Sequence, residues 1–433
     1  MLSFIGFIMI ISIVYLLLKG KTTPIVVFIG VPLVAALFAG FGSEEISGFV
    51  GAGLDKTWNM SVLFIFSVMY FGMMNDVGMF DVVVNKLIRW SGNNVIAVTV
   101  ATAIIGIISH LDGATATTVL VTIPAMLPLY KRLNIRPHVL LLIVGVGMGV
   151  MNLVPWGGPT ARVATVLQMD ANDLWKILIP MQIAGLLITI ATAVIFGIME
   201  KKRGAGTIND EISIDLDANI GEEALALKRP KLTWFNLLLT AIMLGFLVAD
   251  IVPSYLVFMV GFAIAATVNF PNYKDQEKRI KAHAPSALSM SATLLASGIL
   301  VGVLNESGML DAMTLTLLKF VPPFIGPYLH LVMAFISLPL GIMIGADSFY
   351  YGLFPLVAEV GATYGVQPLS MGVALLIGKN VGLLVSPLVP ATFLAIGYAE
   401  IPLKEHLRFS FKYLWIISLV TVIAAIALGV IAI

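Results

Sequence analysis

Long apolar runs recur along almost the whole chain, and they constrain its fold more than any other feature. The first of them, residues 2–18, contains no charged side chain. A helix needs about 20 mostly apolar residues to cross the hydrocarbon core of a bilayer. Only 11% of the residues are charged, whereas soluble domains carry about 25%, so this chain cannot present a water-compatible surface. We therefore expect an all-α polytopic membrane protein.

Ten stretches are apolar and long enough for full membrane spans. They cover residues 2–18, 24–42, 57–77, 138–169, 175–199, 234–250, 254–270, 286–307, 368–398 and 409–431.

Two further apolar segments, 93–130 and 324–361, are interrupted near their middle by polar residues. The interruptions are His110–Thr118 in the first segment and Gly345–Gly352 in the second. Non-helical backbone at membrane depth is tolerated only where protein buries it or water reaches it. We therefore interpret both segments as re-entrant hairpins, which enter and leave the membrane on one side.

The distribution of lysine and arginine tests this count, because cytoplasmic loops are enriched in these residues. With the N-terminus outside the cytoplasm, 20 of the 25 basic residues fall in cytoplasmic segments and 3 fall outside. The remaining 2, Arg162 and Lys379, lie at membrane depth. If each hairpin were one full span, the loops between the hairpins would lie on the opposite side of the membrane. The basic residues would then no longer be concentrated on one side. The pattern predicts that both termini are extracytoplasmic.

A charged stretch, residues 200–233, separates two halves of similar length. It has basic residues at both ends, acidic residues between them and no aromatic residue. Such a composition does not support a packed core, so we expect a cytoplasmic linker without a fold of its own. The first half then covers residues 1–199 and the second half residues 234–433.

The two halves share a motif that indicates an inverted repeat. Gly72–Asp81 and Gly302–Asp311 both follow the pattern G-x-x-N-[DE]-x-G-M-x-D. Each motif follows a predicted span and precedes a hairpin. Because each half has five full spans, an odd number, the halves face opposite ways across the membrane. Inverted repeats are typical of secondary transporters, whose substrate site lies near the midplane where the repeats meet.

The span after each hairpin, 138–169 or 368–398, is broken by glycine and proline. Proline at the first helical position, after a small or capping residue, is a helix-start signal. The second arms of the hairpins also begin near the midplane, at residues 113–118 and 348–352. Helix N-termini present free N–H groups and the positive end of the helix dipole. Four half-helix starts that converge on one region predict an anion site.

Charged side chains at membrane depth are costly and usually functional. The alternative for Arg162, Lys379, Asp112 and Asp347 is internal pairing that only holds helices together. His110 fits two roles equally, a proton carrier or a polar cap of the first hairpin. The residues that we expect to bind substrate are the polar, charged and glycine residues of the four starts: Asp112, Gly113, Thr115, Thr117, Gly157, Gly158, Thr160, Arg162, Asp347, Ser348, Lys379, Asn380, Ser386 and Thr392.

At these motifs the chain resembles the citrate–divalent metal:proton symporters, the CitMHS family of the ion transporter superfamily. The resemblance covers nearly the whole length. Its most specific segments are Leu111–Gly113 with the threonine run that follows, Ala125–Tyr130, Ile135–Pro137 and Gly145–Thr160. The chain departs from the family pattern at Ala114, where the family has a second acidic residue.

The resemblance implies uptake of citrate in complex with a divalent metal ion of the Mg²⁺ or Ca²⁺ type, driven by protons, in a bacterial inner membrane. Asp112 and Asp347 would then contact the metal ion or carry the proton, with His110 as a third proton candidate. Mg²⁺ tends to keep several of its waters, which fits binding as a complex rather than in a protein cage. The resemblance also implies a homodimer of elevator type, in which a scaffold domain holds a mobile transport domain that carries the hairpins.

We expect no permanently bound cofactor, and the net charge of +1 gives no indication of a nucleic-acid partner. A sodium-coupled di- or tricarboxylate carrier of the same superfamily is the main alternative. An ion channel is less favoured, because no single row of pore-lining polar residues stands out. A membrane enzyme is least favoured, because the chain contains neither H-E-x-x-H nor G-x-S-x-G and has no cysteine.

Overall fold

The computed structural model describes residues 1–206 and 222–432, and these two ranges form helices joined by short turns, without a strand. The all-α expectation is therefore confirmed. The helices of the first half are α1 (Leu2–Lys19), α2 (Pro24–Phe38), α3 (Ser43–Asp76), α4 (Asp81–Ser91), α5 (Val95–Ser109), α6 (Thr115–Arg132), α7 (Pro137–Met151), α8 (Gly158–Leu167) and α9 (Ala171–Arg203). Residues 207–221 of the expected linker lie outside the described residues.

The second half repeats the same order of elements after the short helix α10 (Glu222–Leu227). Its helices are α11 (Thr233–Ala249), α12 (Ser254–Asn269), α13 (Tyr273–Glu306), α14 (Met309–Leu317), α15 (Leu329–Ile344), α16 (Phe354–Thr363), α17 (Pro368–Asn380), α18 (Pro390–Ala399) and α19 (Leu403–Ala427). Each half thus has two helices, one very long helix, a short helix, a helical hairpin, a broken pair and a long last helix.

The inverted relation between the halves is visible where α3 packs against α13. The Ser61 hydroxyl donates to the Ser291 carbonyl oxygen at 3.4 Å, and the Ser291 hydroxyl donates back to the Ser61 carbonyl oxygen at 2.8 Å. These serines are 230 positions apart, and the same offset joins Asn75 to Asn305 in the shared motif. A pseudo-two-fold axis between the two serines accounts for the reciprocal bonds.

Glycines let α3 and α13 approach backbone to backbone. A Cβ atom on Gly53 would lie 2.0 Å from the Gly298 carbonyl oxygen, and a Cβ atom on Gly302 would lie 2.2 Å from the Phe49 carbonyl oxygen. Neither distance is possible for a side chain, so only glycine fits there. Small residues have this role in closely packed membrane helices.

Both long helices begin earlier than the predicted spans 57–77 and 286–307. Hydropathy identifies only their apolar parts, but hydrogen bonds stabilise the polar first turns. The Gly42 N–H donates to Glu45 Oε2 at 2.8 Å, and the Lys274 N–H donates to Asn272 Oδ1 at 2.9 Å. Such capping bonds satisfy the free N–H groups of a helix start.

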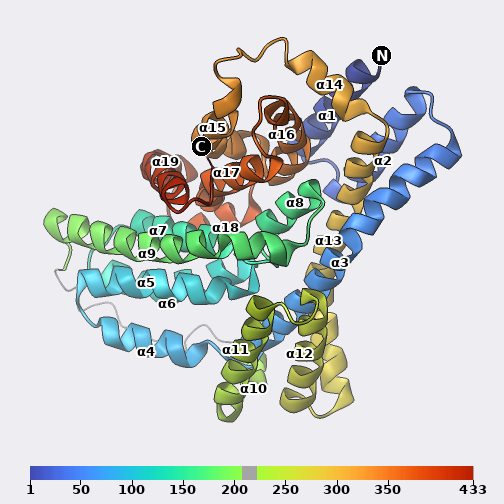
Figure 1. The fold of residues 1–433 in the computed structure, drawn as a ribbon. Helices are drawn as coiled ribbons and strands as arrows, with labels where there is room; N and C mark the ends of the chain where they lie inside the picture. Colours follow the sequence, from blue (N-terminus) through green and yellow to red (C-terminus); the bar gives the residue numbers. More distant parts are fainter. Residues whose placement is uncertain (207–221, 433) are drawn as a thin grey trace.

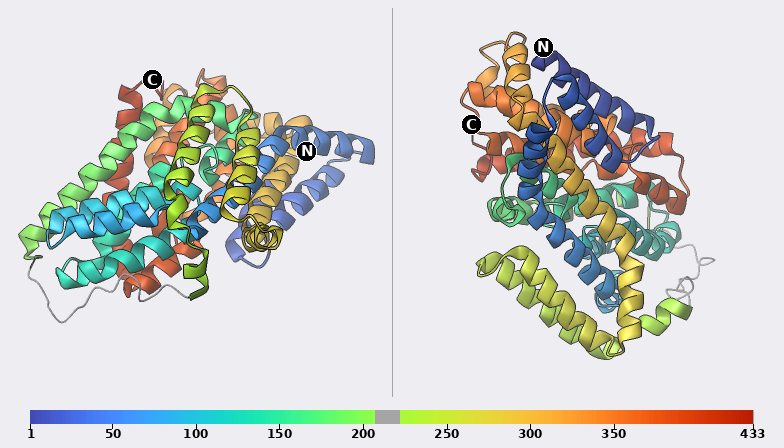
Figure 2. Two further views of the ribbon diagram at one scale, coloured as in Figure 1. Left: turned by 90° about the horizontal axis from the view of Figure 1, so that it is seen from below. Right: turned by 90° about the vertical axis from the view of Figure 1, so that its right-hand side faces the viewer.

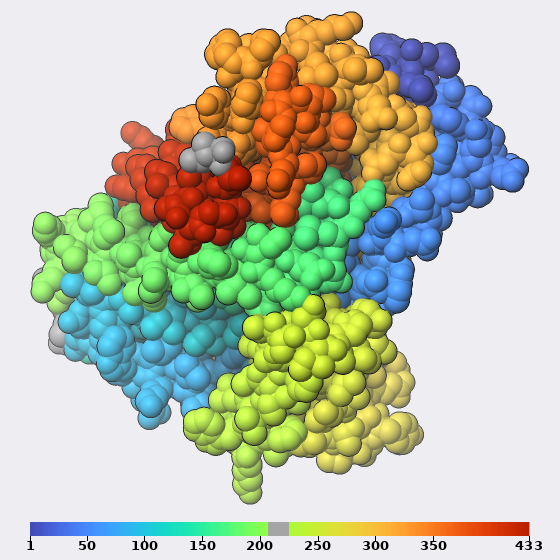
Figure 3. Space-filling model, viewed as in Figure 1, coloured from blue at the N-terminus to red at the C-terminus, as the bar shows by residue number. Residues whose placement is uncertain are grey.

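The helices form two groups, which Figures 1 and 2 show from three sides. We call α1–α3 with α11–α13 the frame, because α1–α2 pack near one end of the α3–α13 pair and α11–α12 near the other. We call α5–α9 with α15–α19 the bundle. In the space-filling view of Figure 3, α11 and α12 project as a lobe below the bundle. The short helices α4 and α14 connect the frame to the bundle in the chain.

Eight helical segments of the described ranges are long and apolar enough to cross a membrane. Two of them contain the first arms of the hairpins, α5 and α15, and four shorter apolar helices, α2, α7, α12 and α18, accompany them. Large apolar side chains lie on the outer surface, for example Ile11, Leu187 and Ile423, which are 65%, 67% and 64% exposed. Exposed apolar surface on this scale suits contact with lipid.

The two hairpins enter the bundle from opposite ends. At the first hairpin, the Gly206 N–H beyond α9 donates to the Leu133 carbonyl oxygen at 2.8 Å. At the second, His330 Nε2 lies 2.8 Å from the carbonyl oxygen of Ala432, near the C-terminus. The helix α19 runs between these two ends, since Glu400, just before it, pairs with Lys131 at 2.9 Å.

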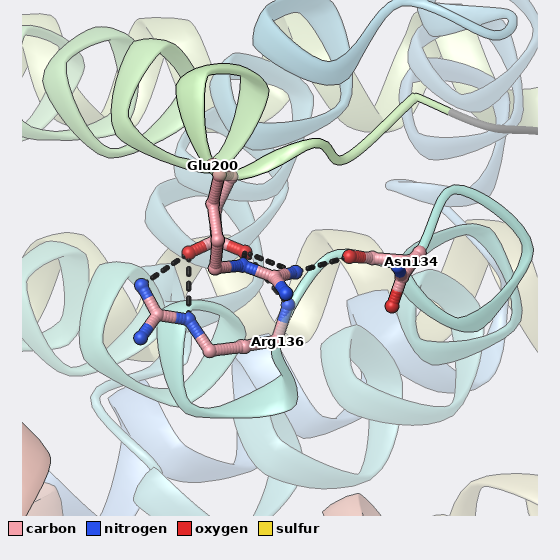
Figure 4. Close-up of polar contacts among 4 residues, drawn as sticks. Asn134, Arg136 and Glu200 are labelled. Atoms are coloured by element: carbon pink, nitrogen blue, oxygen red, sulfur yellow. Dashed lines mark hydrogen bonds and ion pairs between the residues drawn. The ribbon is translucent and has the colours of Figure 1, made fainter.

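A buried carboxylate fastens the end of α9 to the turn between α6 and α7 (Figure 4). Glu200 is fully buried and accepts hydrogen bonds from the Arg136 Nε at 2.7 Å, the Arg136 N–H at 3.1 Å and the Arg203 Nε at 2.9 Å. The Arg203 guanidinium also donates to the Asn134 carbonyl oxygen. We call these four residues the Glu200 cluster. Its carboxylate is fully satisfied, as a buried charge requires.

Candidate functional site

A cavity of about 270 Å³ lies where the tips of both hairpins meet both broken helices. Its walls come from four parts of the bundle and one helix of the frame. The residues that line it are Gly113–Thr115, Asn152, Gly158, Pro159 and Arg162 of the first half, and Met290, Leu338, Gly341, Ile342, Ala346, Lys379, Asn380, Gly382, Leu383, Ser386 and Val389 of the second half. Three of the four expected half-helix starts, those of α6, α8 and α18, therefore border the cavity, whereas residues 348–352 do not line it.

The two helix breaks contact each other at this cavity. The first lies between the end of α7 at Met151 and the start of α8, and the second between α17 and α18. A Cβ atom on Gly149 would lie 2.6 Å from the Asn380 carbonyl oxygen, so the ends of α7 and α17 touch through their backbones. Proline stands in the first turns of α8 and α18, where its fixed φ and missing N–H suit a helix start.

The tip of the first hairpin is braced by the first helix break. Trp156 Nε1 donates to the Leu111 carbonyl oxygen at 2.7 Å. Gly113 has φ 69°, a left-handed conformation that favours glycine. Asp112 is only 8% exposed, and its Oδ1 accepts from the Ala114 N–H at 2.8 Å. Asp112 therefore lies behind the cavity wall rather than in it.

His110 connects the two arms of the first hairpin to the helix break. The ring is fully buried, with Nδ1 2.7 Å from the Thr118 hydroxyl and Nε2 3.2 Å from Asn152 Oδ1. Both nitrogens are thus occupied by neutral partners. This geometry favours the polar-cap interpretation of His110, and its role as a proton carrier stays a prediction.

Arg162 and Asp347 form an ion pair that joins the two halves of the chain. Arg162 Nε donates to Asp347 Oδ1 at 2.8 Å, and each side chain is 22% exposed. Arg162 lines the main cavity. It also lines, together with Asp347, a second cavity of about 200 Å³ that reaches Ser289 and Thr293 of the frame. We call Arg162 and Asp347 the site pair.

Lys379 brings a second cation to the main cavity. Its Nζ lies 4.8 Å from the ring centroid of Tyr350 and 5.2 Å from that of Phe349. Contacts of this kind with aromatic faces stabilise a desolvated ammonium group. Among the described residues no carboxylate lies within 4.0 Å of Lys379. The cavity therefore contains one cation that is paired and one that has only aromatic partners.

Half of the predicted substrate residues line the main cavity, namely Gly113, Thr115, Gly158, Arg162, Lys379, Asn380 and Ser386. Asp347 lines the adjacent cavity. The others line neither cavity: Asp112, Thr117, Gly157, Thr160, Ser348 and Thr392.

Three of these residues have buried side-chain hydroxyl groups, and their hydrogen bonding differs. The Thr160 hydroxyl donates to the Asn152 carbonyl oxygen at 2.8 Å. The hydroxyls of Ser348 and Thr392 are buried without a hydrogen-bond partner among the described residues. Sequence reasoning missed Asn152 and Met290 as wall residues. Asn152 was detectable as a polar side chain at the end of an apolar helix, but nothing in the sequence singles out Met290 of α13.

The arrangement suits a small anion. Backbone N–H groups at the starts of α6, α8 and α18 surround the cavity, and anions bind well at such termini. In the described ranges no group of three or more histidine, cysteine or acidic side chains is placed to hold a metal ion. A cation in this cavity would therefore take most of its ligands from the anion or from water.

Comparison with known proteins decides the family. The CitMHS citrate transporter family model matches residues 5–378. The chain belongs to the CitMHS citrate transporter family. The resemblance seen at the helix breaks and hairpin tips is thus confirmed over most of the chain.

Several relatives from Bacillus subtilis (strain 168) match this CitMHS protein from end to end. One, a citrate transporter, is 40% identical over 432 residues and covers 100% of both chains. Another, a Mg(2+)/citrate complex secondary transporter, is 36% identical and covers 99% of this chain and 98% of the relative. Because these relatives are named as transporters, the prediction of a transporter rather than an enzyme is confirmed.

The fold also has a solved counterpart. The crystal structure of the Alcanivorax borkumensis YdaH transporter superimposes with a TM-score of 0.63 and covers 90% of each chain. The sequences are only 17% identical, so this likeness concerns the fold alone. It supports the all-helical fold of the CitMHS protein.

Proposed function

We propose that this protein takes up citrate as a complex with a divalent metal ion, in symport with protons. The main cavity carries the proposal, because helix starts, Arg162 and Lys379 surround a space that suits a compact polycarboxylate. Arginine binds carboxylates through two parallel hydrogen bonds, and Lys379 adds a point charge. The relative that is named a Mg(2+)/citrate complex transporter supports the choice of substrate.

The metal ion enters this proposal as part of the substrate. Citrate supplies carboxylate and hydroxyl oxygens, which are the ligands that Mg²⁺ and Ca²⁺ prefer. Asp347 is the carboxylate nearest to the cavities, and Asp112 stands behind the wall formed by Gly113 and Ala114. These two residues are our candidates for contact with the metal ion or its waters.

We assign the coupling proton to Asp112, with His110 and Asp347 as the other candidates. Asp112 is buried and has no cation within 4.0 Å among the described residues. Asp347, in contrast, would lose its contact with Arg162 on protonation, and both nitrogens of His110 already have partners. Asp112 is therefore the carboxylate that can gain a proton without breaking an ion pair.

The frame and the bundle suit the roles of scaffold and transport domain in an elevator-type carrier. Both hairpins, both helix breaks and nearly all of the cavity wall belong to the bundle, whereas Met290 is a frame residue. We further propose a homodimer in a bacterial inner membrane, with the Glu200 cluster on the cytoplasmic side and both termini outside. The clustering of basic residues supports this orientation.

Sodium coupling to a di- or tricarboxylate is the alternative function. In this alternative the carboxylates of the substrate would meet the same helix N-termini, Arg162 and Lys379. Dependence of uptake on Na⁺ and not on a pH gradient would favour this alternative.

Uptake of labelled citrate into proteoliposomes tests the proposal. We expect uptake that requires a divalent cation, increases when the outside is more acidic than the inside, and is unchanged when Na⁺ is replaced by choline. Uptake that proceeds in a chelator and requires Na⁺ would contradict the proposal.

A further inference from the structure

The site pair lies between two cavities, of about 270 Å³ and about 200 Å³. Arg162 and Gly158 line both the main cavity and the second cavity, whereas Asp347 lines only the second. One hydrogen bond of 2.8 Å joins the two side chains, and each keeps 22% of its surface exposed. A ligand in the main cavity therefore meets Arg162, whereas a ligand in the second cavity meets both members of the pair.

The energy of breaking this pair depends on what replaces each partner. Removing one member of a partly buried pair leaves the other charge desolvated and unpaired, which is strongly unfavourable. Free citrate can replace Asp347 on Arg162, but Asp347 then faces an anion without a cation. A free divalent ion can replace Arg162 on Asp347, but Arg162 then faces a cation without an anion.

We infer that the site pair selects the metal–citrate complex over its separate components. In the complex, a carboxylate of citrate takes the place of Asp347 on Arg162, while the metal ion or its waters take the place of Arg162 on Asp347. Both charges of the pair are then compensated at once. This inference rests on the proposed function and adds the reason why anion and cation would bind together.

The surroundings of Asp347 suit a change of partner. Asp347 follows Gly345, which has φ 76°, and it precedes a π-helical segment, Ser348–Leu353. Such segments interrupt regular helices and occur often at functional sites. The Ser348 hydroxyl is buried without a partner among the described residues, and it stands beside Asp347 in the chain. The Asp347 carboxylate is therefore held by few local bonds besides that to Arg162.

Lys379 supplies a positive charge that can balance the net negative charge of the metal–citrate complex. Its ammonium group has aromatic partners and no carboxylate within 4.0 Å among the described residues. A metal–citrate complex carries a net negative charge, which Lys379 can balance while the site pair divides between the two ions.

Binding measurements on the purified transporter test the inference. Calorimetric titrations would use citrate with a chelator, Mg²⁺ alone, and the two together. The wild-type protein should bind the mixture at least about tenfold more tightly than either component. In Asp347→Asn, Arg162 is free, so citrate in chelator should bind at least about tenfold more tightly than to the wild type. In Arg162→Gln, Asp347 is free, so Mg²⁺ alone should gain affinity.

Asp112→Asn is the matched control, because it removes a hairpin-tip carboxylate without releasing an arginine. Its affinity for citrate in chelator should increase less than the affinity of Asp347→Asn does. If neither site-pair variant gains affinity while both keep a cooperative melting transition, the inference is wrong, although metal–citrate transport can still be correct. Wild-type protein that binds metal-free citrate as tightly as the mixture would also overturn it. Wild-type protein that binds neither citrate nor the mixture would reject the proposed function itself.

Discussion

The site pair and the Glu200 cluster both join an acidic side chain to arginine, but their surroundings differ. Glu200 has no exposed surface and accepts bonds from two arginines and a backbone N–H. Among the described residues, Asp347 has one side-chain hydrogen-bond partner, Arg162, and it lies beside a cavity. A carboxylate with every acceptor position satisfied fixes two segments together, whereas one with a single partner beside a cavity can exchange that partner. Bond number and access to a cavity, rather than charge alone, therefore distinguish the candidate site from the structural cluster.

The largest expected effect concerns the cation of the site pair. Arg162→Ala should weaken binding of the metal–citrate complex about 100-fold, since losing one partner of a hydrogen-bonded charge pair costs about 2–5 kcal/mol. Arg162→Lys keeps the charge but loses the planar guanidinium, so its affinity for the complex should lie between those of the wild type and Arg162→Ala. Calorimetry on purified protein measures both variants. Unchanged affinity in Arg162→Ala would show that Arg162 only holds the two halves together.

The second prediction separates substrate binding from proton coupling at Asp112. Asp112→Asn imitates the protonated form, so it should still exchange citrate across the membrane but lose accumulation driven by a pH gradient. Counterflow and pH-driven uptake in the same proteoliposomes measure the two activities. Loss of exchange as well would indicate that Asp112 contacts the substrate complex. Normal accumulation would exclude both roles.

The third prediction concerns the Glu200 cluster, which should affect stability and not substrate binding. Glu200→Gln should lower the free energy of unfolding by about 2 kcal/mol, because it removes the charge that pairs with both arginines. Loss of a fully buried ion pair would cost more, but both arginines are partly exposed. The affinity for metal–citrate should stay the same, since Glu200 lies at the far end of α9 from the cavity. Thermal unfolding in detergent and calorimetry check the two parts. A large loss of affinity at unchanged stability would contradict the assignment.

The smallest effect is expected from a probe of orientation. Lys202 is exposed next to the Glu200 cluster, and the chain has no native cysteine. Lys202→Cys should leave transport unchanged and react with an impermeant maleimide only from the cytoplasm. Leu428→Cys, which directly follows the C-terminal end of α19, should react only from outside. Labelling of both from the same side would reject the proposed topology.

The hairpins and helix breaks were predictable because polar residues, glycine and proline interrupt otherwise apolar segments there. The early starts of α3 and α13 were not, because capping bonds at Glu45 and Asn272 stabilise turns that are not apolar. The site pair was foreseen only as two charges at membrane depth with internal pairing as one alternative. Its partners lie 185 positions apart, so hydropathy could not show that they meet. Met290 is likewise distant in sequence from the other residues of the cavity wall.

The central claim is that citrate and the metal ion cross the membrane together, and a double-label uptake experiment tests it most directly. Proteoliposomes would receive labelled citrate and a radioactive divalent ion, and both would be counted in the same vesicles. We predict that the two labels enter at a constant ratio of one metal ion per citrate, and that a chelator abolishes the uptake of both. Citrate that enters at full rate without the metal label would contradict this account.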